Sequence, residues 1–127
     1  MDAPIGTPRF HATLGVLLLL SKHGGTLSSA EMAERLGVHA VYLRKIVARL
    51  LELGLVAAKE GRDGGYRLRW PADRLSLADA YEATIRAPLR QNEREDRWFS
   101  LDQVKAEIES CTMVCLKKYK ISDVWIE

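Results

Sequence analysis

Two cysteines, Cys111 and Cys115, carry the most reactive side chains of the sequence and stand four residues apart. At that spacing both thiols lie on one face of a helix. Thiolates bind metals and undergo oxidation, but an iron–sulfur cluster normally needs four ligands. No His, Asp or Glu is obviously placed to complete such a set, so the sequence predicts no metal site and no bound cofactor.

The same spacing suits a disulfide within the helix poorly, because it holds the two α-carbons near the far limit of disulfide reach. We therefore expect both cysteines to be buried packing residues. The alternative is a redox role, through pairing across a dimer or through mixed disulfides.

Basic residues form the second group of candidates. From residue 29 to residue 69 the sequence has eight Lys or Arg against five Asp or Glu, whereas the whole chain of 127 residues has a net charge of only +2. A modest local excess on one face is enough for contacts with phosphates. The local distribution of charge, rather than its total, therefore points to nucleic acid.

Other classes of protein are poorly supported. The longest apolar run, residues 14–20, is much shorter than the roughly 20 residues of a membrane span, and its flanks do not resemble a secretory signal. We expect a cytoplasmic protein that does not contact membranes. The three histidines, His11, His23 and His39, fall in separate elements, and neither a Ser/His/Asp set nor a phosphate-binding loop is visible. An enzyme is therefore not expected.

Caps and hydrophobic periodicity predict the elements that position the basic residues. A first helix over residues 8–23 lies between a Thr-Pro start and a Gly-Gly stop. A capping box at Ser28 and Glu31 starts a second helix over residues 29–36. A third helix ends at Gly54 and turns four apolar residues inward: Leu43, Ile46, Val47 and Leu50. Two short helices joined by a turn that contains Gly are typical of a helix-turn-helix.

A β-hairpin is predicted directly after these helices. Residues 55–58 and 66–68 have the pattern of its strands, and the Gly-rich segment between them forms its tip. A helix-turn-helix followed by a hairpin makes a winged helix, in which the tip is the wing. A fourth helix is expected over residues 77–85, with Ser76 as its cap.

The composition changes after the fourth helix. Residues 86–97 have little apolar content, which indicates a linker or loop. Ser100 then caps a last helix whose apolar stripe, remote from the winged core, needs a partner surface, most simply a second copy in a dimer. The predicted fold is mainly α with a small β-hairpin wing: a winged helix-turn-helix DNA-binding domain (1–85), a linker (86–99), and a C-terminal dimerisation helix and tail (100–127).

The outward face of the third helix and the wing hold the candidate DNA contacts. The first residues of such a helix reach base edges in the major groove, where Arg44 or Lys45 can donate to guanine. A narrow minor groove attracts an arginine such as Arg62, although Asp63 stands beside it. The candidate DNA-binding residues are His39, Val41, Tyr42, Arg44, Lys45, Arg49, Arg62 and Tyr66.

Together these segments resemble the Rrf2 family of bacterial transcriptional regulators, over about residues 8 to 85. The resemblance rests on SAEMAERLGV from residue 29, YLRKI from residue 42, GGYRL from residue 64 and LSLAD from residue 75. It implies a dimeric winged-helix protein that binds a palindromic operator, usually as a repressor. It also implies that the last long helix makes the dimer. It also implies that the base-reading positions fall on His39, Val41, Tyr42 and Arg44.

Two departures from the family pattern concern the wing and the sensor. The family's wing commonly carries an Arg that enters the minor groove, and this chain has Glu60 there. Because a carboxylate repels phosphate, that contact either moves to Arg62 or is lost. Several members hold an iron–sulfur cluster on three closely spaced cysteines around the start of the long helix, whereas Cys111 and Cys115 come later. We therefore expect a regulator without a cluster.

The leading hypothesis is a homodimeric, sequence-specific DNA-binding repressor that responds to a small molecule, a protein partner or cysteine oxidation. The alternative is a winged-helix protein-interaction module that no longer binds DNA. Glu60 and Asp63 favour the alternative, and the basic residues of the third helix oppose it. Binding through several phosphates weakens steeply with added salt, so salt dependence distinguishes the two.

Overall fold

The computed structural model of the chain describes residues 7–85 and 101–124. Its elements follow in the order α1 (Pro8–His23), α2 (Ser29–Leu36), α3 (Ala40–Glu52), β1 (Val56–Lys59), β2 (Gly65–Leu68), η2 (Ala72–Arg74), α4 (Leu77–Ile85), α5 (Asp102–Lys117) and η3 (Ile121–Val124). The predicted linker and the predicted cap Ser100 lie outside the described residues.

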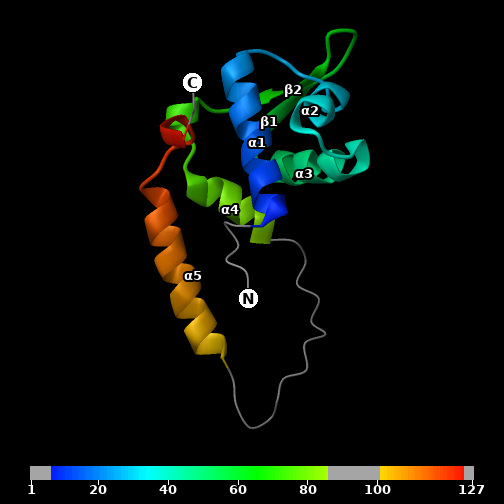
Figure 1. The fold of residues 1–127 in the computed structure, drawn as a ribbon. Coiled ribbons are helices and arrows are strands. Elements are labelled where there is room, and N and C mark those ends of the chain that lie inside the picture. The colour runs from blue at the N-terminus through cyan, green and yellow to red at the C-terminus, as the bar shows by residue number, and fades with distance from the viewer. Residues whose placement is uncertain (1–6, 86–100, 125–127) are drawn as a thin grey trace.

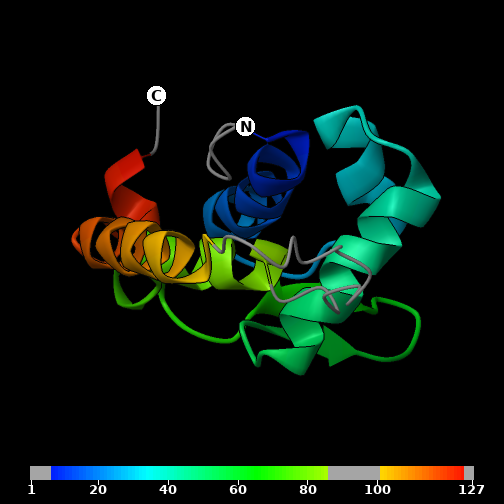
Figure 2. The same ribbon diagram turned by 90° about the horizontal axis from the view of Figure 1, so that it is seen from below.

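Helix α1 is the centre of the fold. It contacts α2, α3, β2, η2, α4 and η3. In Figure 1 the helix-turn-helix and the hairpin lie on one side of α1, and α4 and η3 lie on the other. Figure 2 shows the same arrangement from below, with α5 on the far side of α1 from α3. The predicted mainly α fold with a two-stranded antiparallel hairpin is confirmed.

Local caps explain where the first helices begin and end. The Thr7 side chain accepts a hydrogen bond from the amide of Phe10 at 3.2 Å. The hydroxyl of Ser28 accepts one from the amide of Glu31 at 3.1 Å, as a capping box requires. The same hydroxyl donates to the Glu31 carboxylate at 3.1 Å. Gly24 ends α1 in the left-handed conformation, which glycine adopts without strain.

The hairpin is joined to the helices by a short third strand-like segment. Val56 lies opposite Leu68, and Lys59 lies opposite Gly65. Leu27 and Tyr66 exchange two backbone hydrogen bonds of 3.0 and 2.8 Å. A Cβ on Gly65 would stand only 2.5 Å from the carbonyl oxygen of Leu27. The glycine therefore permits the close approach that attaches the wing to the segment before α2.

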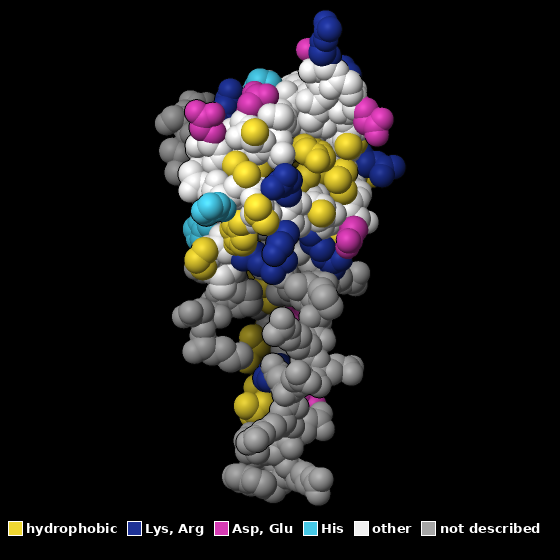
Figure 3. All heavy atoms as spheres, turned by 90° about the vertical axis from the view of Figure 1, so that its right-hand side faces the viewer, with side chains coloured by type: hydrophobic (Ala, Val, Ile, Leu, Met, Phe, Trp, Pro, Cys, Tyr) yellow, Lys and Arg dark blue, Asp and Glu magenta, His cyan; other side chains and the backbone are white. Residues whose placement is uncertain are grey.

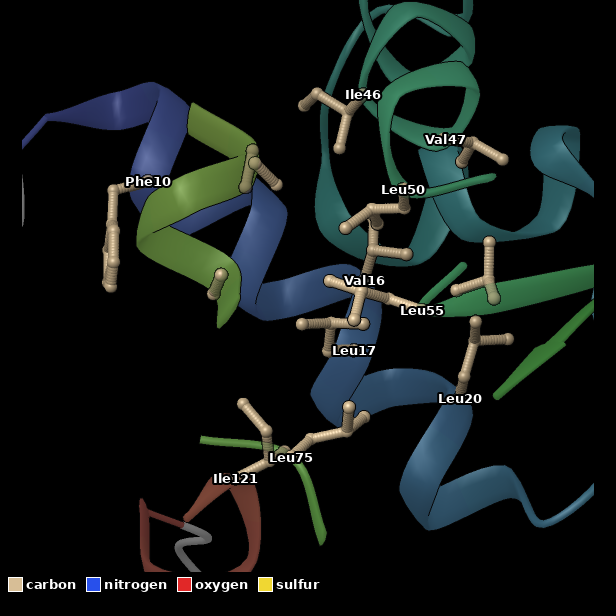
Figure 4. Packing of buried hydrophobic residues seen from close by; sticks show 14 of the residues in the cluster. Phe10, Val16, Leu17, Leu20, Ile46, Val47, Leu50, Leu55, Leu75 and Ile121 are labelled. Carbon is tan, nitrogen blue, oxygen red and sulfur yellow. The ribbon is translucent and has the colours of Figure 1, made fainter. Parts of the chain in front are cut away.

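The core fills the space between α1, α3, β1 and α4. Val16 and Leu17 of α1 are 0% exposed, and they lie between α3 and the segment around Leu75 (Figure 4). The four inward positions that the periodicity predicted for α3 are all buried, which confirms the helix orientation. Burial of apolar side chains is the main driving force for folding.

The C-terminal segment also belongs to this core. Ile121 is 0% exposed and Leu116 is 4% exposed, and both pack with the helices of the winged part. Residues 102–110 of α5, in contrast, are all exposed. The end of α5 packs into the core, and α5 also contacts α4, so the expectation that the last helix is remote from the winged core is wrong, although its first half is exposed.

Candidate nucleic-acid interface

The outward face of α3 carries four of the predicted contacts in exposed positions. His39 is the N-cap of the helix, and its side chain makes no capping hydrogen bond. Val41 is 55% exposed, and Arg44 and Lys45 are exposed. Neither basic side chain makes an ion pair with another described residue. Both charges are therefore available to an anionic ligand.

Two predicted contacts, both tyrosines, are held partly inside the domain. Tyr42 and Tyr66 are half-buried and pack against the core cluster. Tyr66 also carries the backbone pairing with Leu27. Their main role in the described structure is to pack α3 and the wing, which leaves only part of each ring for a ligand.

Arg49 is placed differently from Arg44 and Lys45. Its guanidinium lies 2.6 Å from the Glu52 carboxylate, one turn later on α3, and its side chain is only 21% exposed. An ion pair of this kind partly neutralises both charges, so Arg49 contributes less to a basic surface than the sequence suggested.

The wing presents charges of both signs. Glu60, Arg62 and Asp63 are all exposed at its tip. The turn is closed by a hydrogen bond of 3.0 Å from the amide of Gly64 to the carbonyl of Gly61. Lys59 is exposed at the end of β1. The tip therefore combines two basic residues with two carboxylates.

A feature that the sequence reasoning missed lies where the wing returns to α3. The indole nitrogen of Trp70 donates to the carbonyl oxygen of Gly54 at 3.0 Å, and the Arg69 guanidinium lies over the Trp70 ring, 5.9 Å from its centroid. Trp70 is still 49% exposed. The adjacent Arg69 and Trp70, directly after the predicted second strand, were the available signal in the sequence.

Figure 3 views the molecule from the side of α3 and the wing. Lys and Arg side chains occur from the tip of the wing to the lower part of the described domain, with apolar side chains between them, and Asp and Glu lie mostly at the margins of this face. Such a surface fits a duplex, in which phosphates attract the cations and base edges offer apolar contacts.

Cys111 and Cys115 are both exposed, which corrects the expectation that both are buried packing residues. Leu116, the residue directly after Cys115, is in contrast 4% exposed. Among the described residues no group of three or more His, Cys, Asp or Glu is arranged to hold a metal ion.

The family model for Rrf2, described as an iron-dependent transcriptional regulator, matches residues 7–124. A protein called HTH-type transcriptional regulator IscR from Cereibacter sphaeroides is 37% identical over 68 residues, which are 53% of this chain and 44% of that protein. A putative HTH-type transcriptional regulator from Haemophilus influenzae is 33% identical over 69 residues, which are 54% of this chain and 46% of that protein. The chain thus spans about half the length of these curated relatives.

The iron in the family description can be tested against the residues of this chain. The sequence contains two cysteines, whereas a cluster is normally held by four ligands. The described residues offer no third ligand near the pair. The donor set of one chain therefore does not fit an iron–sulfur cluster.

Solved structures share the fold over nearly the whole chain. The structure titled T. potens IscR has a TM-score of 0.70 at 23% identity and covers 97% of this chain and 85% of its own. CymR, titled the global cysteine regulator of B. subtilis, has a TM-score of 0.70 at 20% identity and covers 98% of this chain and 95% of its own. None of the described helices is long and apolar enough to cross a membrane. From the wing, the recognition helix and the match over residues 7–124, the chain belongs to the Rrf2 family of transcriptional regulators.

Proposed function

We propose that the chain is a sequence-specific DNA-binding repressor that acts as a homodimer on a palindromic operator. One observation carries the proposal: Arg44 and Lys45 stand exposed on the outward face of α3, opposite four buried apolar residues. A helix anchored in this way can enter the major groove without losing its packing.

Base recognition is assigned to the first two turns of α3. The start of a recognition helix lies deepest in the groove, and here it carries His39 and Val41. Arg44, one turn further, has the fork of donors that matches the O6 and N7 atoms of guanine. Lys45 is a compact positive charge suited to a phosphate. The partly buried Tyr42, Arg49 and Tyr66 are assigned to positioning and to contacts at the edge of the interface.

The wing supplies a weaker second contact. Arg62 is exposed at its tip and fits a narrow minor groove. Glu60 and Asp63 are exposed on the same tip and repel phosphates. We therefore expect the operator to be read mainly by α3, with a contribution from the wing that depends on groove width.

A second copy is needed to read two half-sites. The exposed first half of α5 gives the two copies a surface through which to pair, and twofold symmetry then places one α3 at each half-site, about 10 base pairs apart. Occupancy of the operator by the dimer blocks access to the promoter, which is repression. A small molecule or a protein effector would act by changing the distance between the two winged domains.

The test is a titration of labelled duplex DNA from the chain's own promoter, at two salt concentrations and against a scrambled duplex. Arg44→Ala combined with Arg62→Ala is expected to weaken binding and to reduce its dependence on salt. Arg74→Ala is the matched control, because Arg74 is exposed in η2, which lies beside η3 and away from α3 (Figure 1). Circular dichroism confirms that each variant is folded.

Two results would oppose the proposal. Equal affinity of the double variant and the Arg74→Ala control would show that the face assigned to DNA is wrong. Absence of selective binding at low salt would favour the protein-interaction module, for which the carboxylates of Glu60 and Asp63 would then be part of the docking surface.

A further inference from the structure

The exposed side of α5 carries a regular apolar stripe. Three of its residues are large and exposed: the N-cap Leu101 at 52%, and within the helix Val104 at 51% and Ile108 at 59%. Cys111 and Cys115 continue the same row and are also exposed. The steps between these five positions alternate between three and four residues, which is the spacing of the a and d positions of a coiled coil. Both thiols therefore stand inside the seam that α5 offers to a partner.

A second copy of α5 is the partner that this stripe fits best. Alternating steps of three and four residues interlock with the same alternation on another helix. The distribution of charge along α5 indicates whether the two helices pair in parallel or antiparallel. The first half of the helix carries Asp102, Glu107 and Glu109 against Lys105, and the end carries Lys117 and Lys118, followed by Lys120. An antiparallel pair places each acidic half beside the basic end of the other helix, whereas a parallel pair would place like charges together.

Antiparallel pairing determines which thiols meet. Helix α5 spans Asp102–Lys117, so Cys111 lies close to its middle and Cys115 lies close to its end. A twofold axis through the middle of the pair brings the two copies of residue 111 near each other. At about 1.5 Å of rise per residue, the two copies of Cys115 are about 12 Å further apart along the helix axes.

We infer that Cys111 forms a disulfide with Cys111 of the partner subunit when the dimer meets a peroxide. The inference rests on the homodimer of the proposed function. One Cys111 thiolate attacks an oxygen of hydrogen peroxide and the O–O bond breaks; the proton that the thiol lost goes to the leaving hydroxide, which gives a sulfenic acid and one water. The sulfur of Cys111 of the partner subunit then attacks that sulfenic sulfur, and a second water leaves as the S–S bond forms. Two thiols and one peroxide give one disulfide and two waters.

A disulfide between Cys111 and Cys115 of one chain does not compete well. In an intact helix residues four apart hold their α-carbons near the far limit for a disulfide. The covalent bond between subunits instead locks the crossing of the two α5 helices. Each winged domain is packed against the end of its own α5. The bond therefore also fixes the distance between the two α3 helices.

The experiment compares the full chain with variants of its two exposed cysteines, Cys111→Ser and Cys115→Ser. Each protein is treated with hydrogen peroxide, quenched with an alkylating reagent and measured on a non-reducing gel and by intact mass. The wild type and Cys115→Ser are expected to shift from 14.3 kDa to twice that mass, and dithiothreitol is expected to reverse the shift. Cys111→Ser is expected to stay at the mass of one chain.

Sedimentation and DNA titration of the same samples in reductant separate this inference from the proposed function. A reduced protein that is dimeric and binds DNA, yet gives no cross-link, overturns the disulfide and leaves the proposed function in place. A cross-link that survives Cys111→Ser and disappears in Cys115→Ser overturns the assignment to residue 111. A protein that is monomeric in reductant overturns both the homodimer and the disulfide.

Discussion

The backbone amide of Ile121 donates to the carbonyl oxygen of Leu75 at 2.7 Å. This bond joins the segment after α5 to the segment before α4, and the amide of Leu77 donates back to the carbonyl of Tyr119 at 2.9 Å. The Ile121 side chain is fully buried beside Leu75 (Figure 4). The C-terminal end of α5 is therefore anchored to the winged domain through Ile121 and Leu75.

Ile121→Ala is expected to lower the free energy of unfolding by about 2–5 kcal/mol, the usual cost of removing a buried Ile side chain. Urea denaturation followed by circular dichroism measures the difference. Val114→Ala is the matched control, because Val114 on α5 is 58% exposed and should change stability by less than about 0.5 kcal/mol. Equal losses in the two variants would contradict the anchoring role of Ile121.

The sequence was sufficient to predict the elements that depend on local signals. The cap at Ser28 and the inward face of α3 are set by neighbours in the chain, and both are confirmed. The folding of Ile121 onto Leu75 joins segments more than forty residues apart, and no local pattern encodes such a contact. The exposure of Cys111 likewise depends on which side of α5 packs against the core, and the sequence of the helix alone does not determine that side.

The candidate site was predictable in part for the same reason. Helical periodicity correctly placed Arg44 and Lys45 on the outward face. It could not show that Arg49 is paired with Glu52, because rotamers and packing decide whether two charges one turn apart meet. The contact of Trp70 with Gly54 depends on how the hairpin folds back, which a one-dimensional pattern does not contain.

Gly65→Ala is expected to destabilise the attachment of the wing. The added Cβ would stand 2.5 Å from the Leu27 carbonyl oxygen, so the two segments must move apart and weaken the hydrogen bonds between Leu27 and Tyr66. We expect a loss of about 1–3 kcal/mol, as for other overpacked sites, measured by thermal or urea denaturation. Gly25→Ala is the control, since its Cβ would meet only the His23 ring, at 3.6 Å. A Gly65→Ala variant as stable as the control would show that the wing tolerates the separation.

Tyr81 is expected to make stability depend on alkaline pH. Burial, and secondly the negative charge of Glu109, raise the pKa of Tyr81 above its ordinary value, which is about 10. The folded state therefore holds the phenol proton more tightly than the unfolded state, and this contribution is present below about pH 10 and is lost as the pH rises through the folded pKa. The Tyr81→Phe variant should therefore lose less stability at alkaline pH than the wild type.

The measurement for Tyr81 is the free energy of unfolding from neutral pH to above pH 10, for the wild type and Tyr81→Phe. The slope of stability against pH should be less steep in the variant on the alkaline side and unchanged near neutrality. Tyr119→Phe, at a residue that is 49% exposed, is the matched control. Identical alkaline slopes for the wild type and Tyr81→Phe would rule out this contribution.

Glu60→Gln is expected to strengthen DNA binding if the wing lies beside the phosphates as proposed. The change removes one exposed carboxylate from the wing tip and keeps its size, so Arg62 meets the groove with less repulsion. An exposed charge interaction is worth about 0.2–1 kcal/mol, which corresponds to roughly a 1.5- to 5-fold gain in affinity. The gain should shrink at high salt, because exposed charges are screened. Asp73→Asn in η2 removes an exposed charge away from α3 and should leave the affinity unchanged. If both variants gain equally, the effect comes from net charge alone and the wing does not approach the DNA.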